Sequence, residues 1–193
     1  MELNQIPRLL DDIKTLGENF FREHESRLQQ AITSCSRALE QGQTIFFFGN
    51  GGSASQAQHL AAELVNRFLL NREPLAAMAL TCDSSVLTSI ANDFAFKDIF
   101  RRQLQALGKP GDVAVGLSTS GTSENVALAL EYARKTGLAT IGFLGNDGGS
   151  CKGHCDFPLV VDSTDTPRIQ EIHLLLGHIL CEQVEQEVCT RKC

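Results

Sequence analysis

Short apolar runs alternate with amphipathic helical patterns through most of this chain, and this alternation constrains the fold more than any other feature. The runs are TIFFF (44–48), AAMAL (76–80), VAVGL (113–117), ATIGF (139–143) and FPLVV (157–161). They do not alternate in polarity, which is typical of strands buried on both faces of a parallel sheet. Strands that alternate with helices in this way predict an α/β fold, with a doubly wound, five-stranded parallel sheet flanked by helices.

The helical patterns between and after these runs follow the period of an α-helix. They cover 53–70, 84–106 with a break near Asn92, 122–136, and about 166–188, where Thr166 and Pro167 take the N-cap and N1 positions. A further helical segment, 4–40, lies outside the alternation, and Gly17 is a candidate break within it. We therefore expect one domain over 1–193, with N-terminal helices in 1–42 and an α/β sandwich in 43–188.

The composition excludes several classes of protein. The chain has 193 residues, of which 42% are hydrophobic and 21% charged, so it can bury a sizeable core. Its formal net charge of −6 disfavours a protein that coats nucleic acid or anionic membrane. No basic segment precedes an apolar run at the N-terminus, and no stretch approaches the roughly 18 apolar residues of a membrane span. We expect a cytoplasmic protein with neither nucleic acid nor membrane as a partner.

The chain contains seven cysteines, an odd number. Without a secretion signal, free thiols in a reducing cytosol are favoured over a disulfide framework. Cys151, His154 and Cys155 in the motif CKGHC are an alternative, because they could form half of a metal site. No second half with zinc-finger spacing occurs elsewhere in the chain.

A glycine-rich motif, GNGGSA (49–54), follows the first predicted strand and leads into a helix. Ligands of open parallel sheets bind beyond the carboxyl ends of the strands. Glycines let the backbone approach a ligand closely, and a helix N-terminus favours an anion. The string also fits the loose dinucleotide pattern G-x-G-x-x-A, but the nearest acidic residue, Asp83, lies later than that pattern requires. A plain strand-to-helix turn is the remaining interpretation.

A second polar motif, STSGTSEN (118–125), follows the third predicted strand. It has five hydroxyl side chains within six residues, whereas a simple N-cap requires one. Hydroxyl and free N–H groups together form a phosphate cradle that needs no cationic side chain. The two motifs on one sheet edge therefore predict a phosphorylated small molecule as the ligand, which a net negative charge does not exclude.

Two helices carry candidate acid–base residues. His59 and Glu63 are four residues apart and share a helix face, either at a site or as a solvated surface pair. On the last helix Glu171 and His178 align best, and Gln170 and His178 can still face one cavity. His173 points elsewhere and is expected to be structural.

Four segments together resemble the phosphoheptose isomerases of the sugar-isomerase (SIS) fold. They are GNGGSASQAQHLAAEL (49–64), IANDFAFKDIF (90–100), LSTSGTSENV (117–126) and RIQEIHLLLGHIL (168–180). The STSGxS motif alone indicates only the SIS fold, whereas the combination of all four is much more specific. The resemblance covers nearly the whole chain, to about residue 188. It implies an aldose–ketose isomerase that converts D-sedoheptulose 7-phosphate into D-glycero-D-manno-heptose 7-phosphate, a precursor of heptose in bacterial surface polysaccharide.

The resemblance also implies roles for individual residues. Glu63 and His178 take the acid–base roles, and one zinc ion per subunit is held by His59, Glu63, Gln170 and His178. The substrate-binding residues are Asn50, Gly51, Gly52, Ser53, Glu63, Asn92, Asp93, Ser118, Thr119, Ser120, Ser123 and Gln170. The family further implies a cytoplasmic homotetramer whose active sites are shared between subunits.

Two alternatives and two departures accompany this resemblance. A related non-enzymatic protein binds the bacterial replication initiator, but this chain keeps both Glu63 and His178. Another sugar-phosphate isomerase of the SIS fold is the second alternative. Thr122 stands where the family often has Asn. Gly177 lies inside the last helix, where glycine costs stability, and it can permit close approach to a neighbouring helix.

Overall fold

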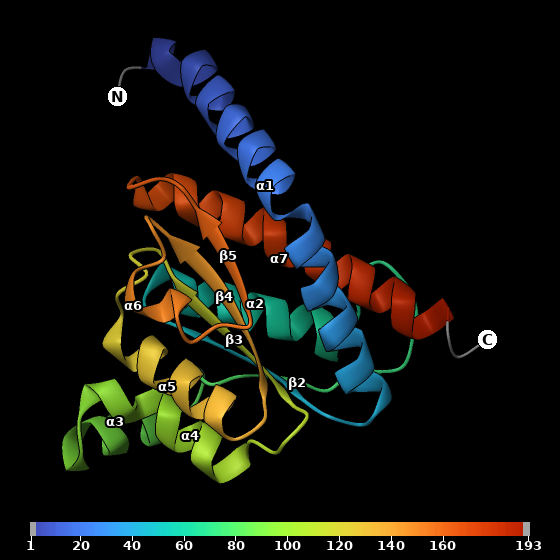
Figure 1. Ribbon diagram of the computed structural model, residues 1–193, viewed down its shortest axis with the longest axis vertical. Helices are drawn as coiled ribbons and strands as arrows, with labels where there is room; N and C mark the ends of the chain where they lie inside the picture. Colours follow the sequence, from blue (N-terminus) through green and yellow to red (C-terminus); the bar gives the residue numbers. More distant parts are fainter. Residues whose placement is uncertain (1–2, 191–193) are drawn as a thin grey trace.

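The structure, a computed structural model, describes residues 3–190 of the chain. Within these residues the strands form one five-stranded parallel sheet in the order β2-β1-β3-β4-β5 (Figure 1). The strands are β1 (Ile45–Gly49), β2 (Ala77–Ala79), β3 (Val113–Ser118), β4 (Ala139–Gly145) and β5 (Phe157–Val161). The predicted doubly wound sheet is confirmed, and every strand lies within two residues of the apolar run that predicted it.

The helices differ from the predicted ones mainly at their ends. They are α1 (Ile6–Glu40), α2 (Gly52–Val65), α3 (Ser84–Asp93), α4 (Ile99–Leu107), α5 (Glu124–Lys135), α6 (Gly149–Lys152) and α7 (Thr166–Thr190), with 3₁₀ turns at Leu3–Gln5 and Phe96–Asp98. The expected break near Asn92 is confirmed, because a non-helical link and a 3₁₀ turn separate α3 from α4. The short helix α6 was not predicted, and α2 ends five residues early.

Two details of the predicted helices are wrong. α1 runs through Gly17 without a break, because that position packs against Ile172 of α7 and the helix is held by tertiary contact. The last helix begins at Thr166, the residue predicted as its N-cap, and so starts one residue before the predicted first helical position, Pro167. The Asp165 carbonyl accepts the hydrogen bond from the Ile169 N–H, and Pro167 lies in the first turn, where its missing N–H costs nothing.

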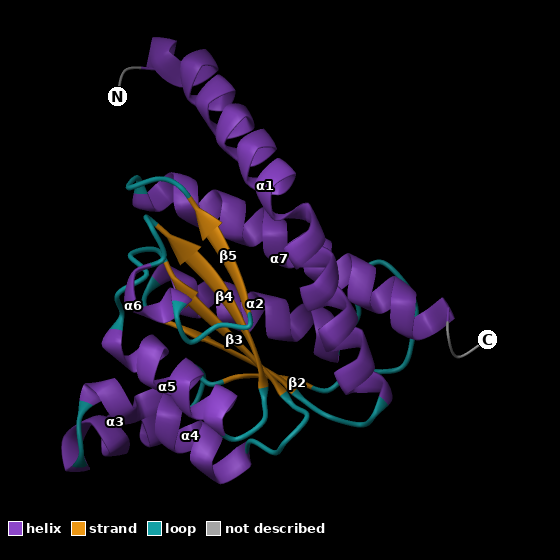
Figure 2. Ribbon diagram, viewed as in Figure 1, coloured by secondary structure: helices purple, strands orange, loops and turns teal. Residues whose placement is uncertain are grey.

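Helices cover both faces of the sheet, which explains why the strand runs do not alternate in polarity. α1, α2 and α7 cover one face, while α3, α4, α5 and α6 lie on the other (Figures 1 and 2). Neighbouring strand residues point to opposite faces. Phe47 accordingly joins the cluster under α1, α2 and α7, and Phe48 joins the cluster under α4 and α5.

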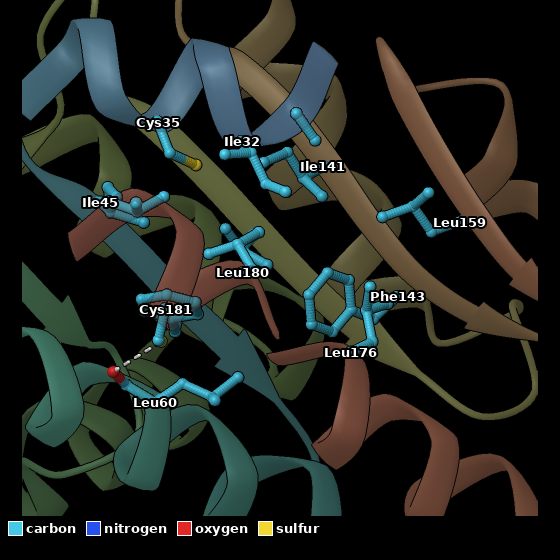
Figure 3. Close-up of a cluster of buried hydrophobic side chains, with 14 of the residues drawn as sticks. Ile32, Cys35, Ile45, Leu60, Ile141, Phe143, Leu159, Leu176, Leu180 and Cys181 are labelled. Atoms are coloured by element: carbon cyan, nitrogen blue, oxygen red, sulfur yellow. Dashed lines mark hydrogen bonds between the residues drawn. The ribbon is translucent and has the colours of Figure 1, made fainter. Parts of the chain in front are cut away.

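The first of these clusters joins both ends of the chain to the sheet. Figure 3 shows Ile32 and Cys35 of α1 close to Leu180 of α7, with Ile141 and Phe143 of β4 beside them. These side chains are at most 2% exposed, so the C-terminal half of α1 is part of the core. The first turns of α1 extend beyond the sheet (Figure 1). Within residues 3–190, no helix combines the length and apolar character required to cross a bilayer.

The strand order places a topological switch point between β1 and β3. The chain leaves β1 through α2 to reach β2 on one side, and β3 lies on the other side of β1. In open α/β sheets such a point opens a crevice at the carboxyl ends of the strands. Gly49 pairs with Leu117, so the segments after β1 and β3 start side by side.

Candidate active site

The glycine-rich segment after β1 favours glycine at three positions. Gly51 has φ +55°, a backbone conformation that side chains disfavour. A Cβ on Gly49 would lie 2.8 Å from the Leu117 carbonyl oxygen, and a Cβ on Gly52 would collide with the Gln170 amide. The tight turn brings the first N–H groups of α2 to the crevice, where Ser53 is buried. The predicted close backbone approach is therefore present.

Three hydroxyl groups of the segment after β3 converge. Ser118 Oγ lies 2.9 Å from Ser123 Oγ and 3.4 Å from Ser120 Oγ. Ser120 Oγ also accepts hydrogen bonds from the N–H and the hydroxyl of Thr122, at 3.2 and 3.1 Å. α5 starts at Glu124, directly after Ser123, so the free N–H groups of its first turn lie beside these hydroxyls. This geometry suits an anion with several acceptor oxygens, such as a phosphate monoester.

This hydroxyl segment is supported from behind by the segment after β4. Gly121 has φ +68° and lies against the Gly148 backbone, so a side chain has no room there. Its carbonyl accepts the Cys151 N–H at 2.9 Å. Asn146, itself at φ +55°, donates from its amide to the Thr119 carbonyl at 3.0 Å. The backbone of the cradle is therefore fixed.

Asn125 is a site residue that the sequence reasoning missed. Its side-chain amide and that of Asn50 exchange two hydrogen bonds, each of 2.8 Å. The side-chain oxygen of Asn125, Oδ1, also accepts the Val126 N–H, and Asn125 is buried. This pair joins the glycine-rich segment to the hydroxyl segment. The signal available in the sequence was an amide side chain after each of two adjacent strands.

The acid–base candidates of α2 and α7 come together. His59 Nε2 lies 3.3 Å from Glu63 Oε1 and 2.8 Å from His178 Nε2. The ring of Phe68, in the loop after α2, stacks on His178 with centroids 5.5 Å apart and an interplanar angle of 17°. The cluster is partly open to solvent, since the side chains of His59 and Glu63 are 45% and 22% exposed. His59 and Glu63 are thus not merely a solvated surface pair.

Gln170, the fourth expected metal ligand, lies at the glycine-rich end of α2. It precedes His178 by eight residues on α7, about 12 Å along the helix axis. Its amide contacts Gly52, and its backbone carbonyl accepts a 2.7 Å hydrogen bond from the Gln56 amide. Gln170 therefore lines the glycine-rich end of the site. Glu171 is exposed and pairs with Arg168.

Asn92 and Asp93 lie at the C-terminal end of α3, and both are exposed. The Asn92 amide donates to the Asp93 carboxylate at 2.8 Å. The link that follows lies near the start of α5, because Lys97 Nζ is 3.5 Å from Glu124 Oε1. The described contacts do not bring either residue to the glycine-rich segment or to the histidines.

Three other candidates have structural positions. Asp83 is the N-cap of α3 and accepts the Val86 N–H at 3.0 Å, so it does not serve a dinucleotide pattern. Burial raises the pKa of Cys151 to about 11 and of Cys155 to about 12, which keeps both thiols protonated at neutral pH. His173 is fully buried and bonded to the Leu144 carbonyl at 3.1 Å. Within the described residues, Cys35, Cys82, Cys151, Cys155 and Cys181 form no disulfide, and Cys193 lies outside the described residues.

The cluster of His59, Glu63 and His178 fits a divalent metal ion. One ligand atom from each residue lies within 4.8 Å of the other two, and within residues 3–190 this is the group that satisfies that condition. Two imidazoles and one carboxylate form a ligand set typical of catalytic zinc, which keeps a fourth position open. In a tetrahedral site the two bound nitrogens lie about 3.3 Å apart, close to the 2.8 Å seen here.

Comparison with known proteins identifies the family of the chain. The family model described as "SIS domain" matches residues 9–145. The phosphoheptose isomerase of Clostridium acetobutylicum is 51% identical over 170 residues, 88% of this chain and 87% of that protein. The phosphoheptose isomerase of Aquifex aeolicus is 53% identical over 189 residues, 98% of this chain and 99% of that protein.

A solved structure is also similar over nearly the full length. The phosphoheptose isomerase from Francisella tularensis superposes with a TM-score of 0.91 at 32% identity, covering 96% of this chain and 99% of its own. Sequence identity, fold and length all agree. The chain therefore belongs to the phosphoheptose isomerases of the SIS-domain family, and it is an isomerase.

Proposed function

We propose that this enzyme interconverts D-sedoheptulose 7-phosphate and D-glycero-D-manno-heptose 7-phosphate through an enediol. The observation that carries the proposal is the meeting of Glu63, His59 and His178, at 2.8 and 3.3 Å. α2 carries two of these residues and starts in the glycine-rich segment, which Asn50 joins to the hydroxyl segment through Asn125. A replication-initiator-binding protein would not require this arrangement.

The position of this cluster suits the substrate's length. α2 starts in the glycine-rich segment, and His59 lies seven residues further, about 10 Å along the helix. In sedoheptulose 7-phosphate the reacting carbons, C1 and C2, lie at the opposite end of the molecule from the phosphate. Phosphate at Ser118, Ser120 and Ser123 would therefore direct C1 and C2 toward the histidines, and fixing that end lowers the entropic cost of the reaction.

The reaction requires two proton transfers at carbon and two at oxygen. In the proposed sequence Glu63 removes the C1 proton while O2 gains a proton from His178, which gives the enediol. His178 then accepts the O1 proton, and Glu63 returns its proton to C2. The reverse assignment of the two residues gives the same products. Asn50, Gly51, Gly52 and Gln170 would contact the sugar hydroxyls, and Asn92 and Asp93 would reach it across a subunit contact.

We further propose zinc as the metal, held by His59, Glu63 and His178, with Gln170 as a fourth candidate ligand. When bound, zinc polarises the carbonyl and hydroxyl oxygens of the sugar. We also propose a cytoplasmic homotetramer with shared active sites. In support, Leu3 and Leu10 near the projecting start of α1 are 81% and 59% exposed, and such apolar side chains are suited to contact with another subunit.

The test is direct. Purified enzyme is incubated with sedoheptulose 7-phosphate, with and without a chelator, and the sugar is followed by NMR. We expect D-glycero-D-manno-heptose 7-phosphate to accumulate to equilibrium, with a lower rate after chelation. Absence of this product under both conditions, with a folded protein, would contradict the proposal. Conversion of arabinose 5-phosphate or a hexose phosphate at a higher kcat/KM would instead favour a different sugar specificity.

A further inference from the structure

A fully buried ion pair lies behind the histidine cluster. Glu185 of α7 is 0% exposed in its side chain and Arg72 only 4%, and Arg72 Nε lies 2.8 Å from Glu185 Oε1. Neither residue belongs to the motifs of the site. A buried pair of this kind is not by itself a source of stability, because both charges lose their hydration. Its other contacts show what it holds in place.

The Glu185 carboxylate binds the loop between α2 and β2. Its oxygens accept the N–H groups of Phe68 at 3.0 Å, Leu69 at 2.8 Å and Leu70 at 2.9 Å. Burial alone would raise the pKa of Glu185, but these three donors and Arg72 outweigh burial and lower it, so the carboxylate is ionised. The side chains of Leu69 and Leu70 are 59% and 40% exposed, so their burial does not hold the loop.

Arg72 binds the end of α2 at the same time. Its guanidinium donates to the Glu63 carbonyl at 3.0 Å and to the Leu64 carbonyl at 2.9 Å. These carbonyls belong to the last turn of the helix, where they have no partner within it. The pair thus contacts α2 at Glu63 itself, and it contacts the loop at Phe68, whose ring stacks on His178.

Glu185 also shares a face of α7 with His178. Seven residues separate them, which is about two turns and leaves both side chains on the same side of the helix. One carboxylate therefore connects α7 and the end of α2, which carry the proton-transferring His178 and Glu63, with the loop that carries Phe68.

We propose that Glu185, with Arg72 as its partner, is a positioning residue that sets the Phe68 ring against His178 and fixes Glu63 at the end of α2. The proposal rests on the proposed function, because it assigns Glu63 and His178 the proton transfers. It predicts that neutralising Glu185 leaves the phosphate cradle intact while misplacing the reacting groups. Misplacement by about 1 Å can cost roughly 100-fold in rate.

Asp112 provides a matched control. It is also a buried carboxylate that ties a loop, accepting the N–H groups of Thr44 at 2.8 Å and Lys109 at 2.7 Å. It lies at the opposite end of the sheet, directly before β3. Glu185→Gln and Asp112→Asn both preserve shape and remove one charge. We expect Glu185→Gln to lower kcat by about 10- to 100-fold with KM within about threefold, and Asp112→Asn to change neither by more than about twofold.

Phe68 supplies a second test that does not depend on folding of the Glu185 variant, because its side chain is only partly buried. Phe68→Leu removes the stacked ring and should lower kcat, whereas Phe68→Tyr keeps the ring and should restore it. Equal kcat in the Leu and Tyr variants, or equal losses in Glu185→Gln and Asp112→Asn, would overturn the proposal.

An NMR measurement separates this proposal from the proposed function. The Phe68 ring current shifts the imidazole proton resonances of His178 in the wild-type protein without substrate. We expect Glu185→Gln to move these resonances toward their Phe68→Leu positions and Asp112→Asn to leave them unchanged. Unmoved resonances in Glu185→Gln would contradict the positioning role. If the wild type fails to isomerise the heptose phosphate, the proposed function fails, but this test still decides the positioning role.

Discussion

The Nε2 atoms of His59 and His178 lie 2.8 Å apart, although the two residues belong to different helices and are 119 positions apart in the chain. Two ring nitrogens approach this closely when they share a proton or bind one cation. Glu63 Oε1, 3.3 Å from His59 Nε2, adds a negative charge to the pair. This arrangement is the basis of the first two predictions.

Zinc affinity should depend on His59. We expect the wild-type chain to bind one zinc ion and His59→Gln to weaken binding by at least about 100-fold, because it removes one of three strong ligands. Competition with a chromophoric chelator measures the affinity. His154→Gln, which alters the histidine of CKGHC, is the control and should bind zinc as the wild type does. Equal weakening in both variants would exclude the cluster on α2 and α7.

Turnover should depend on the Glu63 carboxylate more than substrate binding does. We expect Glu63→Gln to lower kcat by about 1,000-fold, within the range for loss of a general acid–base group, while the phosphate cradle still holds the sugar. Turnover by NMR and substrate Kd by calorimetry check this. Glu171→Gln changes an exposed carboxylate on α7 and should keep kcat within about twofold. Near-normal kcat in Glu63→Gln would remove Glu63 from the mechanism.

Asn50 and Asn125 should be energetically coupled. Either single change to Ala leaves a polar partner without its hydrogen bonds, which costs about 1–3 kcal/mol. The double variant loses both partners together, so its destabilisation should be smaller than the sum of the two by about 1 kcal/mol or more. Urea unfolding of the four proteins measures the coupling. Strict additivity would show that the two amides do not stabilise each other.

Gly177→Ala should destabilise the protein, although alanine favours helices by about 1 kcal/mol. A Cβ at this position would lie 2.5 Å from a methyl group of Leu60, a fully buried side chain of α2 that would have to shift within the core. We expect a net loss of about 1–3 kcal/mol in thermal or urea unfolding.

Gly17→Ala is the matched control for this change, because its Cβ would meet Ile172 at an ordinary 3.4 Å. At position 17 the higher helix propensity of alanine should outweigh any crowding and raise the free energy of unfolding by up to about 1 kcal/mol. A Gly177→Ala protein as stable as Gly17→Ala would show that α2 and α7 adjust their separation freely.

His173 should make the protein sensitive to acid. Burial lowers its pKa from 6.5 to about 4, an effect that outweighs the bond to the Leu144 carbonyl. Between these values the unfolded chain binds a proton that the folded chain does not, so stability falls as the pH drops from 6.5 to 4. The loss is on the order of 3 kcal/mol. Urea unfolding of wild type and His173→Gln across this range should show a shallower decline in the variant.

Local patterns predicted much of the fold. The apolar runs located all five strands, because strands covered on both faces lack polar alternation. The interruption near Asn92 was also predicted, but helix ends were less accurate. The loop 66–76 was partly assigned to a helix, since its conformation depends on Glu185, more than 100 residues away. Gly17 does not break α1, because packing on α7 outweighs its low helix propensity.

The candidate site, like the fold, was predicted only in part from the sequence. The glycine-rich and hydroxyl segments were recognisable because each is local in sequence and follows a strand. Their connection through Asn50 and Asn125 was not, since it depends on which strands are neighbours. The contact of the Gln170 amide with Gly52 was not predicted either, since it depends on how α7 packs against α2.

The sequence by itself determined the parallel α/β architecture, the two polar segments at the strand ends and the family to which the chain belongs, because each is encoded in short runs of neighbouring residues. Only the tertiary structure decided that His59 meets His178, that Gly177 admits Leu60, and that Glu185 holds the loop carrying Phe68. The physical reason is that these relationships arise from parallel packing of α2 on α7, and no local pattern specifies which residues of two distant helices come into contact.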